Sequence, residues 1–147
     1  MESDGLKIGV IGAGAWGTAL ARLLASSGNF VQLWCHEPET AKNIHHKHVN
    51  TSFLPDILLP ESLGASTDLL EIVRNSRILV AAPPSHLTRE IAKKIRPEIT
   101  AEHILLILSK GIEQHSLALM SEIFAEELDN LPKLAVLSGP TFAREVA

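Results

Sequence analysis

Short apolar runs alternate along the chain with segments in which apolar residues recur every three or four positions. The runs have the length and the β-branched, apolar character of strands that are buried on both faces of a sheet. They predict strands over residues 6–11, 30–35, 77–82, 103–108 and 133–137. Residues 49–66 show no clear period and contain prolines and a glycine, so they predict a loop with room for a short strand.

The segments between these strands predict helices. Their apolar stripes consist of Trp16, Ala19, Leu20, Leu23 and Leu24; of Leu87, Ile91 and Ile95; and of Leu117, Met120, Phe124 and Leu128. Residues 38–46 and 67–73 predict two further helices, the first of which opens with a proline. Gly28 stands where a glycine ends a helix, and Ser85 is placed to cap the helix that carries Ile91.

This alternation predicts the fold. Consecutive strands separated by helices form right-handed crossovers, which give parallel strands with helices packed on both faces. With 147 residues, of which 46% are hydrophobic, the chain is long enough for one such domain. We therefore expect a Rossmann-type, doubly wound α/β fold over residues 1–147, and its ligands should lie beyond the carboxyl ends of the strands.

The composition argues against several kinds of partner. A net charge of −4 gives no support for binding to nucleic acid or to an anionic membrane. No apolar run approaches the roughly 20 residues that span a bilayer, and the first residues lack the pattern of a secretion signal. The one cysteine, Cys35, fits a reducing compartment and is expected to be a small core side chain. We expect a cytoplasmic protein.

The stretch "GAGAWG" follows the first predicted strand and places Gly12, Gly14 and Gly17 in the G-x-G-x-x-G spacing. In this motif the first glycine permits a tight turn, the second lets a pyrophosphate approach the backbone, and the third lets the helix pack closely on the strand. Because the motif lies between a strand and an amphipathic helix, which is the context it requires, it predicts dinucleotide binding.

The choice between NAD and NADP should be visible after the second strand, where the chain reads "WCHEPE". Glu37 lies where a carboxylate would bind the ribose 2′-hydroxyl of NAD, although an acid in the first turn of a helix is also favoured by the helix dipole. His36, with Lys42 in the same segment, would instead suit the 2′-phosphate of NADP. These residues leave the choice open.

Two more strand ends carry candidate residues. After the strand at 77–82, Pro83 and Pro84 would hold the backbone extended beneath a nicotinamide ribose, or would simply stiffen the strand exit. After the strand at 103–108, "SKGIE" places Lys110 next to a glycine; this lysine could meet the cofactor, a phosphate or a polarised carbonyl, or could be an ordinary surface residue. The cluster "HHKH" at 45–48 has no nearby carboxylate or thiol group with metal-site spacing, so we predict no metal site.

In order along the chain, "GVIGAGAWGTALA", "LWCHEPE", "NTSFLPDILLP", "PPSH", "SKGIE" and "LSGPTFAREVA" together resemble the bacterial-type NAD(P)-dependent glycerol-3-phosphate dehydrogenases. The resemblance runs from Lys7 to Ala147 and implies the reversible reduction of dihydroxyacetone phosphate to sn-glycerol 3-phosphate, for glycerophospholipid synthesis. It also implies a homodimer for the full-length protein.

The resemblance assigns roles to individual residues. Together with the motifs above, it implies cofactor contacts from Gly12, Gly14, Ala15, Trp16, Gly17, His36, Pro83, Lys110 and Ala143. It implies substrate contacts from Lys110, Gly139 and Thr141. Many relatives carry serine at position 15 and arginine at position 36, so a phosphate-binding hydroxyl is absent here and the expected preference for NADP is slight.

No residue of this chain is predicted to be the catalytic acid or base. In the family, the lysine that transfers the proton and the groups that bind the substrate phosphate belong to a second, helical domain. No such domain is found in this sequence. We therefore expect the natural protein to continue past Ala147, and the isolated domain to bind cofactor with almost no turnover.

Other functions share the same first motif. A ketopantoate reductase or an opine dehydrogenase begins with this kind of domain, but "SKGIE" followed by "SGPTFA" is less expected there. A non-catalytic domain that senses nucleotides is a further alternative. Flavin enzymes and methyltransferases also have a glycine-rich first turn. Titration with NADH, NADPH, FAD and S-adenosylmethionine would separate these classes.

Overall fold

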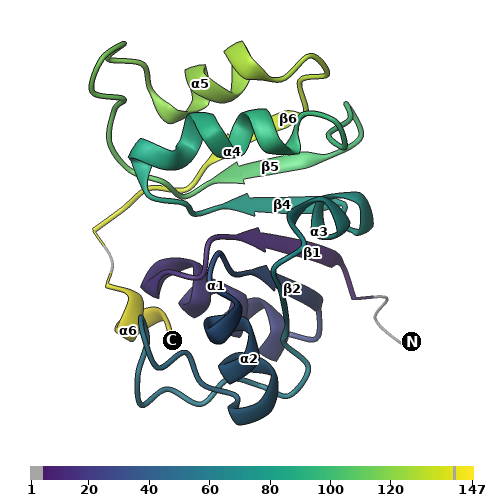
Figure 1. The fold of residues 1–147 in the computed structure, drawn as a ribbon, viewed down its shortest axis with the longest axis vertical. Helices are drawn as coiled ribbons and strands as arrows, with labels where there is room; N and C mark the ends of the chain where they lie inside the picture. The colour runs from purple at the N-terminus through teal and green to yellow at the C-terminus, as the bar shows by residue number, and fades with distance from the viewer. Residues whose placement is uncertain (1–4, 141) are drawn as a thin grey trace.

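The computed structural model describes residues 5–140 and 142–147, and it contains a six-stranded parallel sheet with the strand order β3-β2-β1-β4-β5-β6. The strands are β1 (Lys7–Ile11), β2 (Phe30–Trp34), β3 (Gly64–Ser66), β4 (Ile78–Ala81), β5 (Ile104–Ile107) and β6 (Lys133–Val136). Every pair of neighbours in the sheet is parallel, as the alternation of strands and helices predicts. Figure 1 shows the strands stacked side by side.

Helices connect the strands and cover both faces of the sheet. They are α1 (Ala15–Ser26), α2 (Pro38–Lys47), α3 (Leu69–Asn75), a 3₁₀ turn η1 (Ser85–Leu87), α4 (Thr88–Ile95), α5 (Met120–Glu127) and α6 (Ala143–Val146). Local sequence signals explain several of their ends. The carboxylate of Asp68 accepts a hydrogen bond from the backbone N–H of Glu71 at the start of α3, and Gly28 takes a positive φ of 86° just after α1.

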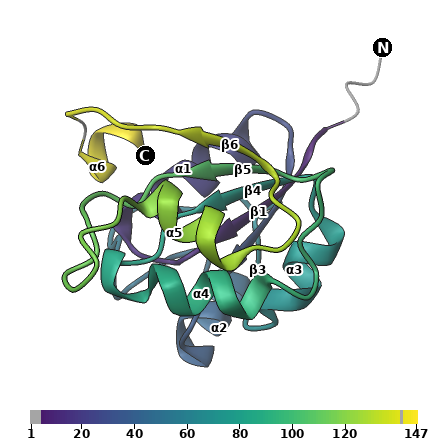
Figure 2. The ribbon, with the colours of Figure 1, turned by 90° about the horizontal axis from the view of Figure 1, so that it is seen from above.

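The sheet separates two apolar layers. Neighbouring residues of a strand point to opposite faces, so Val10 packs with α1 and α2 while Ile11 packs with α3, α4 and α5. Figure 2 shows α3, α4 and α5 on one side of the sheet and α1 on the other. Cys35 is fully buried in the layer of α1 and α2, as expected for a core side chain. Among the described residues no helix combines the length and apolar character needed to cross a membrane.

The topology positions the site. Strand β1 lies between β2 and β4, so the chain winds outward from β1 in both directions. The carboxyl ends of these strands open a crevice at this switch point, which is where ligands bind in doubly wound sheets. The turn after β1 and the segments after β2, β4 and β5 all meet at this edge.

Some local predictions were wrong, among them those for Ser85, Leu117 and the last strand. Ser85 does not cap α4, because it begins the 3₁₀ turn η1, and no side-chain cap bond is formed there. Leu117 lies before α5, has a φ of 60° and is exposed. The loop that contains it is held by its own hydrogen bonds, so α5 begins only at Met120. The last strand, β6, was expected to be buried like the others, but it is the edge of the sheet and its Val136 side chain is 60% exposed.

Candidate functional site

The turn between β1 and α1 is packed too closely for side chains at two of its glycines. Gly12 has a φ of 115°, and a Cβ there would lie 2.7 Å from the carbonyl oxygen of Ala82. A Cβ on Gly17 would lie 2.0 Å from the carbonyl oxygen of Gly12. The turn is thus pressed against both the end of β4 and the first turn of α1, as the motif requires.

Gly14 has the opposite surroundings. A Cβ at this position would meet no atom within 4 Å, and its backbone angles are ordinary. Gly14 is the N-cap of α1, and no side chain there accepts a hydrogen bond from the helix. The N-terminus of a 12-residue helix is therefore open to an anion, which is the arrangement that binds a pyrophosphate.

A cavity of about 400 Å³, the glycine-turn cavity, extends from this turn across the carboxyl ends of β1, β2 and β4. Gly12 and Gly14 of the glycine turn line this cavity. His36 and Glu37, after β2, and Pro83, after β4, line it as well. Six residues selected from the sequence therefore meet at one cavity: Gly12, Gly14, His36, Glu37, Pro83 and Pro84. The remaining walls are largely apolar and come from Trp34, Phe53, Leu87 and Ile91.

The charges at the glycine-turn cavity come from two helices. Glu37 is the N-cap of α2, but its side chain makes no cap bond there and is exposed. On α4, Lys94 forms an ion pair with Glu90 at 2.6 Å, and this bond lowers the pKa of the Glu90 carboxyl. Lys42, considered earlier beside His36, does not line the cavity, whereas Lys94 does.

A second cavity, of about 250 Å³, lies beyond the ends of β5 and β6 and is called here the strand-end cavity. Trp16, Lys110 and Gly139 line it together with apolar side chains of α1, the ends of β5 and β6, and α6. The amine of Lys110 donates a hydrogen bond to the carbonyl oxygen of Gly139 at 2.8 Å. It also lies 5.8 Å from the centre of the Trp16 ring, within range of a cation–π contact.

The loop that carries Lys110 is fastened to its neighbours. Gly111 has a φ of 104°, so the glycine after the lysine supplies the backbone angle expected for it. Ser109 donates a hydrogen bond to the carbonyl oxygen of Pro83, which joins the loop after β5 to the loop after β4. Three residues after Lys110, both oxygens of Glu113 accept hydrogen bonds from the Arg89 guanidinium at 2.7 Å. These bonds lower the pKa of the Glu113 carboxyl to about 2.

The other predicted site residues have varied surroundings. Ala15 begins α1 next to Gly14, and Ala143 begins α6, which packs against α1. Thr141 lies outside the described residues.

Lys110 is the one ionisable side chain among the described residues that line the strand-end cavity. Within residues 5–140 and 142–147, no three His, Cys, Asp or Glu side chains are grouped so that they could hold a metal ion.

Sequence reasoning missed part of the glycine-turn cavity. Leu87 was assigned to the buried stripe of a helix, yet it is 38% exposed and lines this cavity from η1. Glu90 and Lys94 are four residues apart, a spacing that predicts an ion pair on a helix but not its position beside a cavity. Phe53 belongs to a segment without periodicity, so nothing local indicated where its ring would lie.

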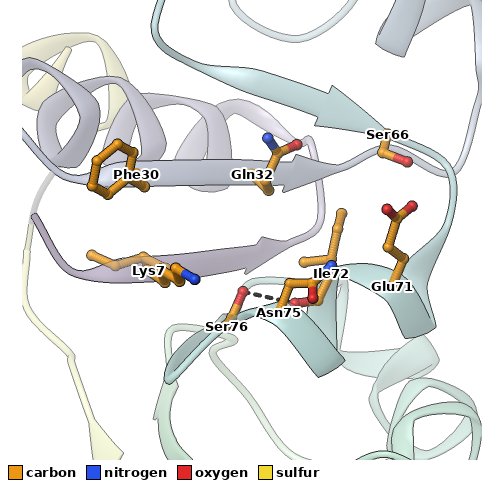
Figure 3. Close-up of a pocket in the computed structure, with 9 residues that line it drawn as sticks. Lys7, Phe30, Gln32, Ser66, Glu71, Ile72, Asn75 and Ser76 are labelled. Atoms are coloured by element: carbon orange, nitrogen blue, oxygen red, sulfur yellow. Dashed lines mark hydrogen bonds between the residues drawn. The ribbon is translucent and has the colours of Figure 1, made fainter.

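A further cavity, of about 330 Å³, lies at the opposite, amino edge of the sheet. Figure 3 shows it between β1, β2 and α3, with Lys7, Gln32 and Glu71 among its walls. It shares no lining residue with the glycine-turn cavity. The candidate site is therefore the pair of cavities at the carboxyl edge.

Comparison with known proteins points to one family. Residues 7–147 match the family described as NAD-dependent glycerol-3-phosphate dehydrogenase N-terminus. A protein of Leptospira biflexa named glycerol-3-phosphate dehydrogenase (NAD(P)+) is 46% identical over 143 residues, which are 96% of this chain and 43% of that protein. The chain thus spans less than half the length of this relative.

Solved structures give the same result. The glycerol-3-phosphate dehydrogenase of Coxiella burnetii superposes with a TM-score of 0.89 at 34% identity, over 97% of this chain and 43% of that one. A ketopantoate reductase of Ralstonia eutropha reaches a TM-score of 0.67 at 20% identity over 89% of this chain and 40% of that one, and it shares the fold alone. Because the family match covers nearly all of the chain, this protein belongs to the NAD-dependent glycerol-3-phosphate dehydrogenase family and corresponds to its N-terminal part.

Proposed function

We propose that this chain is the cofactor-binding part of an enzyme that reduces dihydroxyacetone phosphate to sn-glycerol 3-phosphate with NAD(P)H. The observation that carries the proposal is the pair of cavities at one edge of the sheet. One holds the glycine turn with its open helix N-terminus, and the other holds Lys110 beside Gly139. An extended dinucleotide needs sites of these two kinds, one for its pyrophosphate and adenosine and one for its nicotinamide.

The chemistry requires little else from this chain. When bound, NAD(P)H would supply the hydride and its two electrons for the ketone carbon, and the ketone oxygen would then need a proton. Lys110 offers a positive charge and N–H donors that can orient this oxygen. Its amine donates a hydrogen bond to the Gly139 carbonyl, which places the charge at the strand-end cavity. We infer that the proton comes from a group outside this chain.

Binding and turnover measurements test the proposal separately. The chain should bind NADH and NADPH, but neither FAD nor S-adenosylmethionine, in calorimetric titrations. The oxidation of NADPH in the presence of dihydroxyacetone phosphate should be nearly absent with the chain alone. Failure to bind either nicotinamide dinucleotide would refute the proposal, and turnover comparable with that of a full-length relative would refute the expected need for a second domain.

We further propose a preference for NADPH, supported by His36 and Lys94 at the glycine-turn cavity. Either side chain could pair with a 2′-phosphate, although Glu37 and Glu90 lie at the same cavity and oppose it. The ratio of NADPH to NADH affinity should fall in His36→Ala and in Lys94→Gln. Lys42→Gln is the matched control, because Lys42 lies outside the cavity. An unchanged ratio in both variants would remove these residues from the argument.

A further inference from the structure

Asn50 is a fully buried polar residue in the loop between α2 and β3. Its Nδ2 atom donates to the carbonyl oxygen of Ala13 at 2.8 Å and to the hydroxyl of Thr18 at 2.9 Å. Ala13 lies inside the glycine turn and Thr18 lies in the first turns of α1. One side chain therefore ties the loop to both elements that present the helix N-terminus.

The same side chain also fixes the loop in the other direction. Its Oδ1 atom accepts a hydrogen bond from the backbone N–H of Phe53 at 3.2 Å. The backbone carbonyl of Asn50 accepts a second one from the backbone N–H of Leu54 at 3.0 Å. The orientation of the amide follows from these partners, because the Ala13 carbonyl can only accept and the Phe53 N–H can only donate. Both Nδ2 hydrogens and Oδ1 are thus used at once.

Phe53 lies in the turn closed by the Asn50–Leu54 hydrogen bond and faces the candidate site. Phe53 is 47% exposed, and it lines the glycine-turn cavity together with Trp34 and Leu87. The next residue, Leu54, is 1% exposed and anchors the loop in the core. An exposed aromatic ring on a hydrogen-bonded turn, beside the apolar part of a cavity wall, can offer a flat face to a flat ligand.

We propose that Asn50 is a positioning residue that holds Phe53 in register with the glycine turn, so that the ring stacks on the adenine of the dinucleotide while the turn holds its pyrophosphate. This inference rests on the proposed binding of NAD(P)(H). Asn50 couples the two contacts because the atoms that fix Phe53 and the atoms that fix Ala13 belong to one amide. A hydroxyl or a methyl group at position 50 cannot make the three bonds together.

Five variants test this coupling: Phe53→Ala, Phe53→Tyr, Asn50→Ser, the double variant of Phe53→Ala with Asn50→Ser, and Asn43→Ser as the matched control. Asn43 is half-buried; its amide has one side-chain bond, at 3.5 Å to Thr51, and makes none to the described residues of the glycine turn. Affinities for NADPH and for ADP-ribose, which lacks the nicotinamide, are measured by calorimetry, with thermal melts to establish that each variant is folded. Phe53→Ala removes an exposed ring and should leave the fold intact.

Phe53→Ala should weaken both ligands by about fivefold or more, the effect expected from the loss of one stacked base contact. Asn50→Ser should weaken both to a similar degree, and the double variant should be little weaker than Phe53→Ala alone, because the two residues act through one contact. Phe53→Tyr should restore affinity, and Asn43→Ser should change nothing.

The outcomes separate the two proposals. A chain that binds no dinucleotide overturns the proposed function and this inference with it. Normal binding by the parent chain with unchanged affinity in Phe53→Ala overturns the stacking role alone. Independent, additive losses in the double variant overturn the positioning role of Asn50, because a residue that only stabilised the fold would not depend on the Phe53 ring.

Discussion

The two cavities of the candidate site are built differently. The glycine-turn cavity lies over the middle of the sheet, where β1 is bordered by β2 and β4 and where Val10 and Ile11 are fully buried. The strand-end cavity lies beside the edge strand β6, where Val136 and Leu137 are 60% and 46% exposed. The first cavity rests on a packed core, and the second rests on a partly uncovered edge.

This difference shows which half of the site the chain itself determines. Around the glycine turn, backbone atoms approach so closely that a single methyl group would collide, and a buried amide fixes the neighbouring loop. Around Lys110, the one ionisable side chain among the described lining residues, the walls of the strand-end cavity are mostly apolar. Dinucleotide binding should therefore depend on packing, and events at the nicotinamide end on Lys110.

The largest expected effect is at Gly17. Replacement by alanine places a Cβ 2.0 Å from the carbonyl oxygen of Gly12, so the turn or the helix must move. We expect the free energy of unfolding to fall by about 3 kcal/mol and dinucleotide binding to be lost. Chemical denaturation and calorimetry measure the two effects.

Gly14→Ala is the matched control, since its Cβ would meet no atom within 4 Å. The stability should change by less than about 1 kcal/mol, whereas NADPH binding should weaken because the methyl group occupies the space of the pyrophosphate. Equal destabilisation by the two alanines would contradict the contrast between a packed and an open glycine.

The next largest effect is expected at Lys110, in the strand-end cavity. Lys110→Met keeps the apolar stem but removes the charge that donates to Gly139 and faces Trp16. We expect roughly tenfold weaker NADPH binding, the usual range for a lost hydrogen bond from a charged group, with unchanged ADP-ribose binding and unchanged stability. An equal loss for both ligands would show that Lys110 does not act at the nicotinamide end.

Much of this architecture could be predicted from the sequence, because local patterns determine it. Period and length located the strands and helices, and the spacing of Gly12, Gly14 and Gly17 within a strand-turn-helix context located the turn. Cys35 was correctly predicted to be a core residue. In each case the information lies within about twenty residues of the position concerned.

The rest depends on contacts between distant segments. Asn50 bonds to residues 32 and 37 positions earlier, a relation that no local pattern carries. The edge position of β6 could not be inferred either, since a run such as "KLAVL" is equally apolar whether or not a layer covers it. Leu117 fits a helical spacing, but the bonds of Glu113 in the preceding loop hold it in a left-handed conformation.

A smaller effect should appear in the pH dependence of stability. The Arg89 guanidinium lowers the pKa of Glu113 from 4.5 to about 2 in the folded chain. A depressed carboxyl pKa stabilises the fold above the unfolded value, and this contribution is lost as the pH falls from about 4.5 towards 2. Glu113→Gln should therefore be less stable than the parent chain at pH 6, and the two should converge near pH 2.

Glu102→Gln provides the control for that comparison, because Glu102 is 81% exposed and its nitrogen–oxygen distance to Arg77 is 3.6 Å. Denaturation at several pH values should show no pH-dependent difference between Glu102→Gln and the parent. A constant difference between Glu113→Gln and the parent from pH 6 to pH 2 would show that the Arg89 contact does not act through ionisation.

The smallest expected effect is at Val136 on the edge strand β6, and it is measured against the same change at buried Val10. Valine to threonine replaces a methyl group by a hydroxyl of similar size, so its cost depends on whether the position is dry. At Val10, which is 0% exposed, the change should cost about 2 kcal/mol, since the hydroxyl would be buried in an apolar layer. At Val136, which is 60% exposed, it should cost less than about 0.5 kcal/mol. Denaturation of both variants over a range of chain concentrations measures this difference. A large, concentration-dependent cost at Val136 would mean that another copy of the chain covers β6 in solution. The uncovered edge beside the strand-end cavity would then exist only in the isolated chain.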